Sequence, residues 1–159
     1  MNGFQRLRST HAPAATFLIR LSVGLIFFTQ GILKFTDPQW GVLRFTKIGF
    51  PWPDVTAHFV GVFEVCCGLL LLLGLFLRLA SIPLLIINLT AIATTKIPEL
   101  FRSEQGFWFM VSDGRTDFAM LTGILFLLIL GAGPWSFDAF ATGSVSAGAD
   151  GGTLDDDAI

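Results

Sequence analysis

Apolar residues occur along this chain in long, nearly unbroken tracts rather than in short alternating patterns. A helix needs about 20 residues to cross a bilayer core about 30 Å thick, because each residue advances it by about 1.5 Å. The tract at 16–35 has this length, and no small-x-small cleavage site follows it, so we expect it to stay as a membrane anchor. The tract at 55–97 is twice too long for one span, and Gly74 and Arg78 mark where the chain must reverse. It therefore predicts two helices, 55–76 and 79–97.

A fourth predicted helix covers 117–130 and ends in Gly-Ala-Gly before Pro134, which disfavours helical geometry in the residue that precedes it. The last residues are mainly Gly, Ser, Ala and Asp, a composition that buries too little apolar area to fold. The predicted fold class is an all-α membrane protein, a bundle of four transmembrane helices with interfacial connecting segments. We expect a polar leader at 1–15, a membrane domain at 16–138 and a disordered acidic tail at 139–159.

Four spans place both termini on one side of the membrane and the two longer connections, 36–54 and 98–116, on the other. Both connections mix aromatic with charged residues, which is typical of amphipathic structure in the lipid headgroup region and also suits a lid. The basic residues near the two faces leave the orientation of the termini undecided. The residues are Trp40, Phe45, Trp52, Phe101, Phe107, Trp108 and Phe109 with Arg44, Lys47, Glu99, Arg102 and Glu104.

The composition agrees with a membrane location: 53% of the 159 residues are hydrophobic and 14% are charged, against about a quarter charged in ordinary soluble domains. So little polar surface excludes nucleic-acid binding. Cys66 and Cys67 are adjacent, which gives neither a disulfide framework nor the spacing of a zinc site, and a redox role for them stays open. His11 and His58 lie at opposite membrane faces, so we expect neither haem nor metal.

The first two predicted helices carry ionisable groups on faces that also contain glycine. Small residues let the backbones of membrane helices approach closely, so we expect these two faces to pack against each other. Spacings of three and four place the members of each face together: Arg20, Gly24, Phe27, Gly31 and Lys34 on the first helix, and Gly61, Glu64 and Gly68 on the second.

Glu64 is the acid that the predicted spans place within the hydrocarbon core, where a charge costs about 2.5 to 3.5 kcal/mol and normally faces protein or water. By helix rise, Gln30 lies level with Glu64, Lys34 lies one turn beyond it, and Asn88 lies near the midplane. Two interpretations remain open. Glu64 is either a neutralised tie between helices, with Arg20 or Lys34 as counter-ion, or a group that binds or protonates a small ligand in a pocket closed by the connections.

A second set of candidates comes from the later part of the chain. Lys34 and Lys96 both end odd-numbered predicted helices at the same face, which indicates either two similar helical hairpins or two lysines that reach the same interface. The segment 112–117 is expected to cap the fourth helix, or else to bring Arg115 or Asp117 into a network with both lysines. The second-tier candidates are Lys96, Arg115, Asp117, Trp108 and His58.

Four pieces of the sequence, in this order and spacing, resemble the DoxX family of small bacterial membrane proteins. They are Arg20-Leu-Ser-Val-Gly24, Gly31-Ile-Leu-Lys34-Phe35, Gly61-Val-Phe-Glu64 with Gly68 and Gly74, and Gly131-Ala-Gly-Pro-Trp135-Ser-Phe-Asp138. The resemblance implies a four-helix protein of the bacterial inner membrane, with Arg20, Lys34 and Glu64 at the positions of the family's motifs. It also implies a link to membrane oxidoreductase assemblies, including a quinone-reducing thiosulfate oxidoreductase. Many members have a glycine pair after the glutamate, where this chain has Cys67-Gly68.

Three functions follow from these patterns as hypotheses. The first is an integral membrane subunit of a redox system that binds a quinone or a similar small apolar ligand in a polar pocket around Glu64, with a soluble or membrane oxidoreductase as partner. The second is a non-enzymatic membrane protein that assembles or stabilises partners. The third is a small proton-coupled carrier, which would act as a homo-oligomer because four helices form only a thin bundle.

Overall fold

The computed structural model describes residues 15–102, 106–131, 133, 135–138 and 140, and these contain helices but no strand. The predicted all-α fold class is therefore confirmed. The predicted leader and tail lie outside the described residues, except for Ala15 and Phe140. The helices are α2 (Thr16–Thr36), α3 (Val42–Ile48), α4 (Pro53–Leu73), α5 (Leu77–Ala91), the π-helix η1 (Ile92–Lys96), α6 (Ile97–Arg102) and α7 (Gly106–Leu130).

Three of the described helices are long and apolar enough to cross a membrane: α2, α4 and the continuous helix Leu77–Lys96 formed by α5 and η1. The helix α7 has 25 residues, which is also long enough. It carries Asp113, Arg115 and Asp117, however, and every 18-residue stretch of α7 contains all three of these charges. By length and composition the structure thus supports three crossings, and the predicted fourth crossing is not confirmed.

The predicted boundaries of the last helix were wrong. Residues 98–116 were expected to form an interfacial connection, but 98–102 belong to α6 and 106–116 form the first part of α7. The segment 112–117 consequently lies inside α7 and does not cap it. The helix continues through this polar segment because α6 and η1 pack alongside it, and such tertiary contacts stabilise a helix more than local propensity does.

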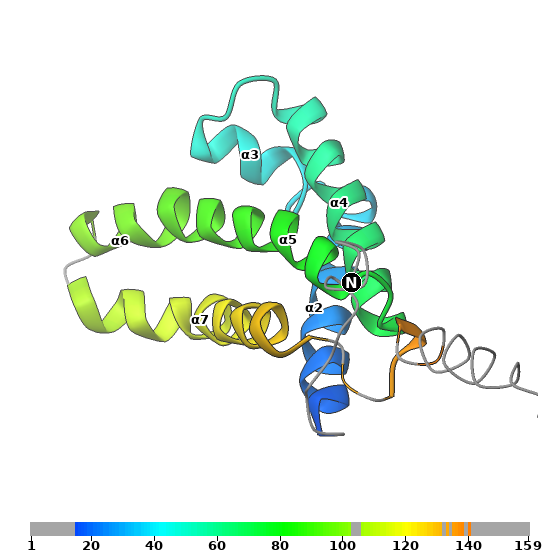
Figure 1. Ribbon diagram of the computed structural model, residues 1–159. Helices are drawn as coiled ribbons and strands as arrows, with labels where there is room; N and C mark the ends of the chain where they lie inside the picture. Colours follow the sequence, from blue (N-terminus) through cyan, green and yellow to red (C-terminus); the bar gives the residue numbers. More distant parts are fainter. Residues whose placement is uncertain (1–14, 103–105, 132, 134, 139, 141–159) are drawn as a thin grey trace, which may run out of the picture.

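The long helices form two hairpins (Figure 1). In the first, α2 packs against α4, and the short helix α3 lies against α4 at the end where the chain turns. In the second, α5, η1 and α6 run alongside α7. The hairpins are joined by a tight turn in which Gly74 has a φ of 70°, a left-handed conformation that favours glycine.

The core lies where the two hairpins meet. Gly123 of α7 faces Val23 of α2 so closely that a Cβ on Gly123 would lie 2.5 Å from Val23 Cγ2. The remaining core residues come from all four long helices and are fully or nearly fully buried. The cluster comprises Val23, Phe27, Cys67, Leu71, Leu77, Ala80, Leu84, Met120, Ile124 and Leu127.

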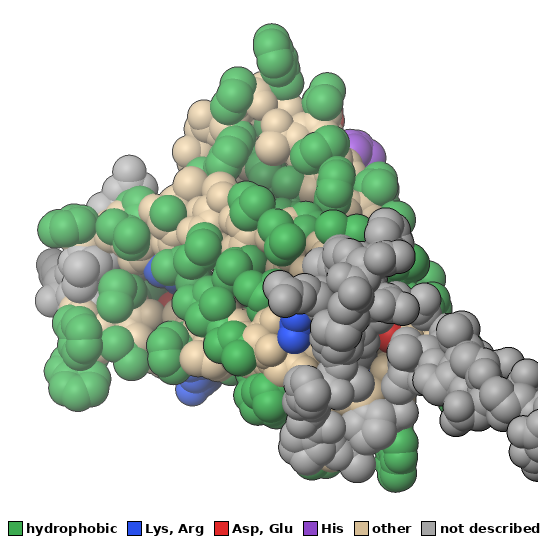
Figure 2. All heavy atoms as spheres, in the orientation of Figure 1, with side chains coloured by type: hydrophobic (Ala, Val, Ile, Leu, Met, Phe, Trp, Pro, Cys, Tyr) green, Lys and Arg blue, Asp and Glu red, His purple; other side chains and the backbone are tan. Residues whose placement is uncertain are grey.

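The outer surface of both hairpins is hydrophobic, and Figure 2 shows apolar side chains spread over the visible face with few charges between them. Monomeric soluble proteins rarely expose such extensive apolar surface, whereas lipid-facing helices require it. Exposed aromatic side chains also gather near both ends of the helices, as is usual at membrane–water interfaces. They include Trp40, Trp52, Phe101 and Trp108 near α3 and α6, and Trp135, Phe137 and Phe140 after α7.

Candidate ligand site at the Lys34–Glu64 pair

Lys34, in the last turn of α2, donates a hydrogen bond to Glu64 Oε2 in the middle of α4, and the two side chains form an ion pair. The exposed fractions of the two side chains are only 10% and 6%. Of the two counter-ions considered for Glu64, the structure thus selects Lys34. Each of these buried charges compensates the desolvation of the other, which neither would tolerate alone.

Close approach of the two helix backbones explains why this pair forms. A Cβ on Gly31 would lie 2.7 Å from the Val65 backbone nitrogen, and one on Gly68 would lie 2.8 Å from the Phe28 nitrogen. The predicted packing of α2 against α4 through glycine faces is therefore confirmed. Lys34 itself lies level with Gly61. Because helical side chains tilt toward the N-terminus, Lys34 reaches back along α2 to Glu64.

The chain after α2 covers this end of the pair. Gly41 approaches the Lys34 carbonyl so closely that a Cβ on Gly41 would lie 2.5 Å from that oxygen. The Gly41 N–H donates to the Asp37 carbonyl oxygen at 3.0 Å, which fixes the turn that leads into α3. On α3, the Arg44 Cζ lies 5.7 Å from the centre of the Trp40 ring. The helix α3 lies within the 36–54 connection and packs on α4; the role of this connection as a lid stays a prediction.

Lys34 and Glu64 have more hydrogen-bond donors and acceptors than the bond between them uses. An ammonium group has three N–H donors and a carboxylate has two acceptor oxygens. Among the described residues, one Lys34 donor and one Glu64 oxygen are used. The pair can therefore donate a hydrogen bond to a carbonyl oxygen and exchange a proton with a hydroxyl group. The described residues contain no group of three metal-ligating side chains.

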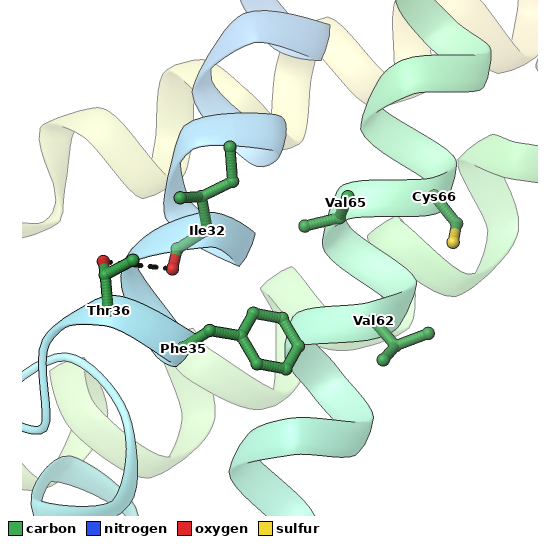
Figure 3. Close-up of a pocket in the computed structure, with 6 residues that line it drawn as sticks. All are labelled: Ile32, Phe35, Thr36, Val62, Val65 and Cys66. Atoms are coloured by element: carbon green, nitrogen blue, oxygen red, sulfur yellow. Dashed lines mark hydrogen bonds between the residues drawn. The ribbon is translucent and has the colours of Figure 1, made fainter.

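An apolar groove of about 400 Å³ lies on the outside of the same helix pair (Figure 3). Consecutive helical residues are about 100° apart, so the groove-lining residues lie on the opposite side of the Gly31–Gly61 contact from Lys34 and Glu64. The Thr36 hydroxyl in its wall donates to the Ile32 carbonyl oxygen at 3.2 Å. This groove is therefore not the polar pocket expected around Glu64. Its lining consists of Ile32, Phe35, Thr36, Val62, Val65 and Cys66.

Arg20 is buried near the opposite end of α2, about 21 Å along the helix from Lys34 at 1.5 Å per residue. Its Nη2 donates to the Trp135 carbonyl oxygen at 2.6 Å, and Nη1 lies next to Gly74. The Asp138 N–H donates to the Gly74 carbonyl oxygen at 3.2 Å, so the segment after α7 folds over the α4–α5 turn. Arg20 is thus part of a second polar cluster and is not joined to Glu64.

Lys96 forms a third polar cluster, within the second hairpin. It makes ion pairs with Asp113 and, at 3.6 Å, with Asp117. Asn88 donates to the Asp117 backbone oxygen at 3.1 Å and so joins α5 to α7 rather than reaching Glu64. Asp113 was missing from the predicted candidates. Its spacing of four residues from Asp117 would have revealed it, had the segment been assigned to a helix.

The remaining candidates are dispersed. Gln30 is half-buried, and no hydrogen bond of its side chain occurs within the described part of the chain. Arg115 and Trp108 are exposed on α7. His58 is exposed on α4; its Nδ1 lies 2.7 Å from the Asp54 carbonyl oxygen, and its ring meets the Phe35 ring edge-on at 5.4 Å.

Comparison with known proteins identifies the family of this chain. The sequence pattern of the DoxX family matches residues 15–97, which include Arg20, Lys34, Arg44 and Glu64. No solved structure matches the chain.

Two relatives extend over most of the chain. An "Uncharacterized membrane protein Rv3486" of Mycobacterium tuberculosis is 46% identical over 138 residues, which cover 84% of this chain and 85% of the relative. The "Putative oxidoreductase CatD" of Bacillus subtilis is 30% identical over 132 residues, which cover 83% of this chain and 94% of the relative. The apolar helices and the membrane-protein relative agree with a membrane location. The chain belongs to the DoxX family of membrane proteins.

Proposed function

We propose that this protein is a multi-pass subunit of a redox system in the bacterial inner membrane, and that it binds a quinone or a similar small ring with an apolar tail at the Lys34–Glu64 pair. The observation that carries the proposal is a nearly fully buried pair of opposite charges between two membrane-length helices. Ionisable groups at such positions usually mark functional sites. The relative named as an oxidoreductase supports a redox context.

The residues of the pair suit such a ligand. A quinone ring has two carbonyl oxygens, and its reduced form has two hydroxyl groups. Lys34 has donors to offer to a carbonyl oxygen, and Glu64 has an oxygen that accepts a proton from a hydroxyl group. In this proposal the electrons come from a partner, a soluble or membrane oxidoreductase, and the redox name of one relative supports this.

A fourth crossing by α7 belongs to the same proposal. Asp113 and Asp117 share one counter-ion, Lys96, on the neighbouring helix, and Arg115 is exposed, so the charges of α7 lie in its N-terminal half. The part of α7 after Asp117 is apolar. With four crossings, both ends of the described chain would lie on the same side of the membrane.

The test compares Lys34 and Lys96, the two largely buried lysines that form ion pairs between helices. Wild-type protein, Lys34→Met and Lys96→Met are purified in mild detergent from the same membranes, and quinone retained per protein is measured by mass spectrometry. We expect Lys34→Met to lose the retained quinone and Lys96→Met to keep it. Equal retention by all three proteins, or no quinone on the wild type, would contradict the proposal.

A second function, a non-enzymatic assembly or stabilising role, is favoured by one observation. Both lysine ties join helices within a hairpin and leave each lysine paired with an acid, as structural ties would. In that case Lys34→Met should lower the melting temperature and the amount of a co-purifying membrane protein, with no change in retained quinone.

A further inference from the structure

The two hairpins share one pattern of buried positions. Their first helices, α2 and α5, both bury residues at successive spacings of four, three and four, and their second helices, α4 and α7, both bury a pair four residues apart. In each second helix an acid that pairs with a lysine lies three residues before this pair: Glu64 in α4 and Asp117 in α7. Asp117 therefore corresponds to Glu64. The buried positions are Thr16, Arg20, Val23 and Phe27 on α2, Leu77, Ser81, Leu84 and Asn88 on α5, Cys67 and Leu71 on α4, and Met120 and Ile124 on α7.

The two lysines depart from this correspondence by one residue. Lys34 follows Phe27 by seven residues, which is about two helical turns, so both lie on the same face of α2. Seven residues after Asn88 comes Thr95, and Lys96 is one residue further. In a continuous α-helix, Lys96 would lie about 80° around the axis from Asn88, whose side chain bonds to α7.

The π-helix η1 removes this mismatch. The Ile97 N–H bonds to the Ile92 carbonyl oxygen, five residues back, so this turn contains one residue more than a turn of α-helix. The extra residue brings Lys96 to the position that Thr95 would otherwise occupy. Lys96 accordingly forms its ion pairs with the two acids of α7, and a Cβ on Gly114 would lie 3.9 Å from its Cγ.

Two features oppose closure of this wide turn into an α-helix. The first is Pro98, because the ring of a proline inside an α-helix collides with the carbonyl group four residues back, here that of Thr94. The second is the pairing of Lys96, whose side chain is only 12% exposed and forms both ion pairs. Closure would turn Lys96 away from both acids.

We propose that η1 is a register device that selects which side chain of the second hairpin faces α7. With the wide turn, Lys96 faces the acids. When the turn closes, Thr95 takes its place, and α6 rotates about its axis by about 100°, the angle of one residue. Because α6 carries Phe101, which is 81% exposed, closure also redirects an aromatic side chain at the end of the hairpin. This inference is independent of the ligand proposed for the Lys34–Glu64 pair.

Matched deletions test the extra residue. Thr94 and Ile32 each lie two residues before a paired lysine, but Thr94 belongs to a π-helix and Ile32 to an α-helix. Thr94 is deleted together with Pro98→Ala, since the shortened segment must form a continuous α-helix. We expect this full-length variant to melt in detergent at the temperature of Pro98→Ala alone. Adding Lys96→Met should lower the melting temperature equally in both, because Lys96 keeps its position.

Deletion of Ile32 is the control. It shortens a helix that has no residue to spare, so Lys34 turns about 100° away from Glu64. We expect the melting temperature to fall strongly. Adding Lys34→Met should then cause no further fall, because the ion pair is already lost.

A disulfide reporter shows which side chain faces α7. Thr95→Cys and Gly114→Cys are combined in a protein with Cys66→Ala and Cys67→Ala. Gly114 lies beside Lys96, so a cysteine at position 95 reaches position 114 when the turn closes.

The yield of the disulfide should be low in the reporter protein. It should rise at least about threefold when Pro98→Ala, Asp113→Asn and Asp117→Asn remove both restraints, because the population shifts toward the closed turn. The same three substitutions should cause no rise after deletion of Thr94, since no extra residue is left.

Three results would overturn the inference. They are a disulfide yield that is the same with and without the restraints, an equal rise after deletion of Thr94, and a fall in melting temperature as large for deletion of Thr94 as for deletion of Ile32. If the substituted reporter protein does not accumulate in the membrane, the comparison of the two deletions decides.

Discussion

Lys34 and Glu64, which are 30 residues apart in the sequence, meet as a nearly buried ion pair beside the close contact between Gly31 and Gly61. The glycines bring the backbones together, and the ion pair then lies where neither charge reaches bulk water. The site therefore depends on backbone packing as much as on its two charged residues, and the two contributions are separable by mutation.

The close packing of α2 against α4 through glycines is tested by adding one methyl group at Gly68. Gly68→Ala places a Cβ about 2.8 Å from a backbone nitrogen of α2, which cannot move without shifting the helix. We expect a clear fall in the melting temperature in detergent, since overpacking typically costs about 1 to 3 kcal/mol. Gly114→Ala is the control, because its Cβ would meet only Lys96 Cγ at 3.9 Å. It should leave the melting temperature unchanged or raise it, as alanine favours helix.

The ion pair is tested by a double-mutant cycle. Lys34→Met alone leaves the Glu64 charge buried without its partner, which typically costs about 3 to 5 kcal/mol. The double variant Lys34→Met/Glu64→Gln should recover most of this loss. Chemical denaturation of the four proteins measures the cycle, and additive effects of the two substitutions would show that the pair does not stabilise the helices together.

The ion pairs of Lys96 should contribute less to stability than the Lys34–Glu64 pair. The Asp113 side chain is 47% exposed and that of Asp117 is 23% exposed. Solvent hydrates these acids when their partner is removed, so Asp113→Asn should cost less than about 1 kcal/mol. The same denaturation assay measures it. A loss as large as that of Lys34→Met would contradict the weaker contribution expected of the more exposed ion pair.

Of the residues that follow α7, those near Trp135 should contribute to stability, whereas those after residue 140 should not. Ending the chain after residue 140 removes part of the predicted acidic tail and should leave membrane accumulation and melting unchanged. Ending it after residue 133 also removes the Trp135 carbonyl, which accepts a hydrogen bond from the buried Arg20. This shorter chain should melt at a lower temperature. If both truncated chains accumulated and melted alike, the segment after α7 would not help to hold Arg20.

The sequence predicted the elements that depend on hydropathy and missed those that depend on contact. Length and apolar content were enough for α2, α4 and α5, because a membrane span requires both. The start of α7 was placed eleven residues too late, since the polar stretch 112–117 looks like a helix boundary until η1 and α6 are seen to pack against α7. The partner of Glu64 stayed undecided between Lys34 and Arg20, because one-dimensional depth does not show in which direction each side chain reaches along its helix.

Infrared difference spectroscopy of Glu64 tests the central claim most directly. The protein is reconstituted in lipid, and spectra are recorded with and without a quinone that has an alkyl tail for wild type, Glu64→Gln and Asp117→Asn. If the ligand binds at the Lys34–Glu64 pair, its arrival changes the carboxyl bands of Glu64. These changes should be absent from Glu64→Gln and present in Asp117→Asn. Carboxyl bands that stay constant on binding, or that change equally in Glu64→Gln, would contradict a ligand site at this pair.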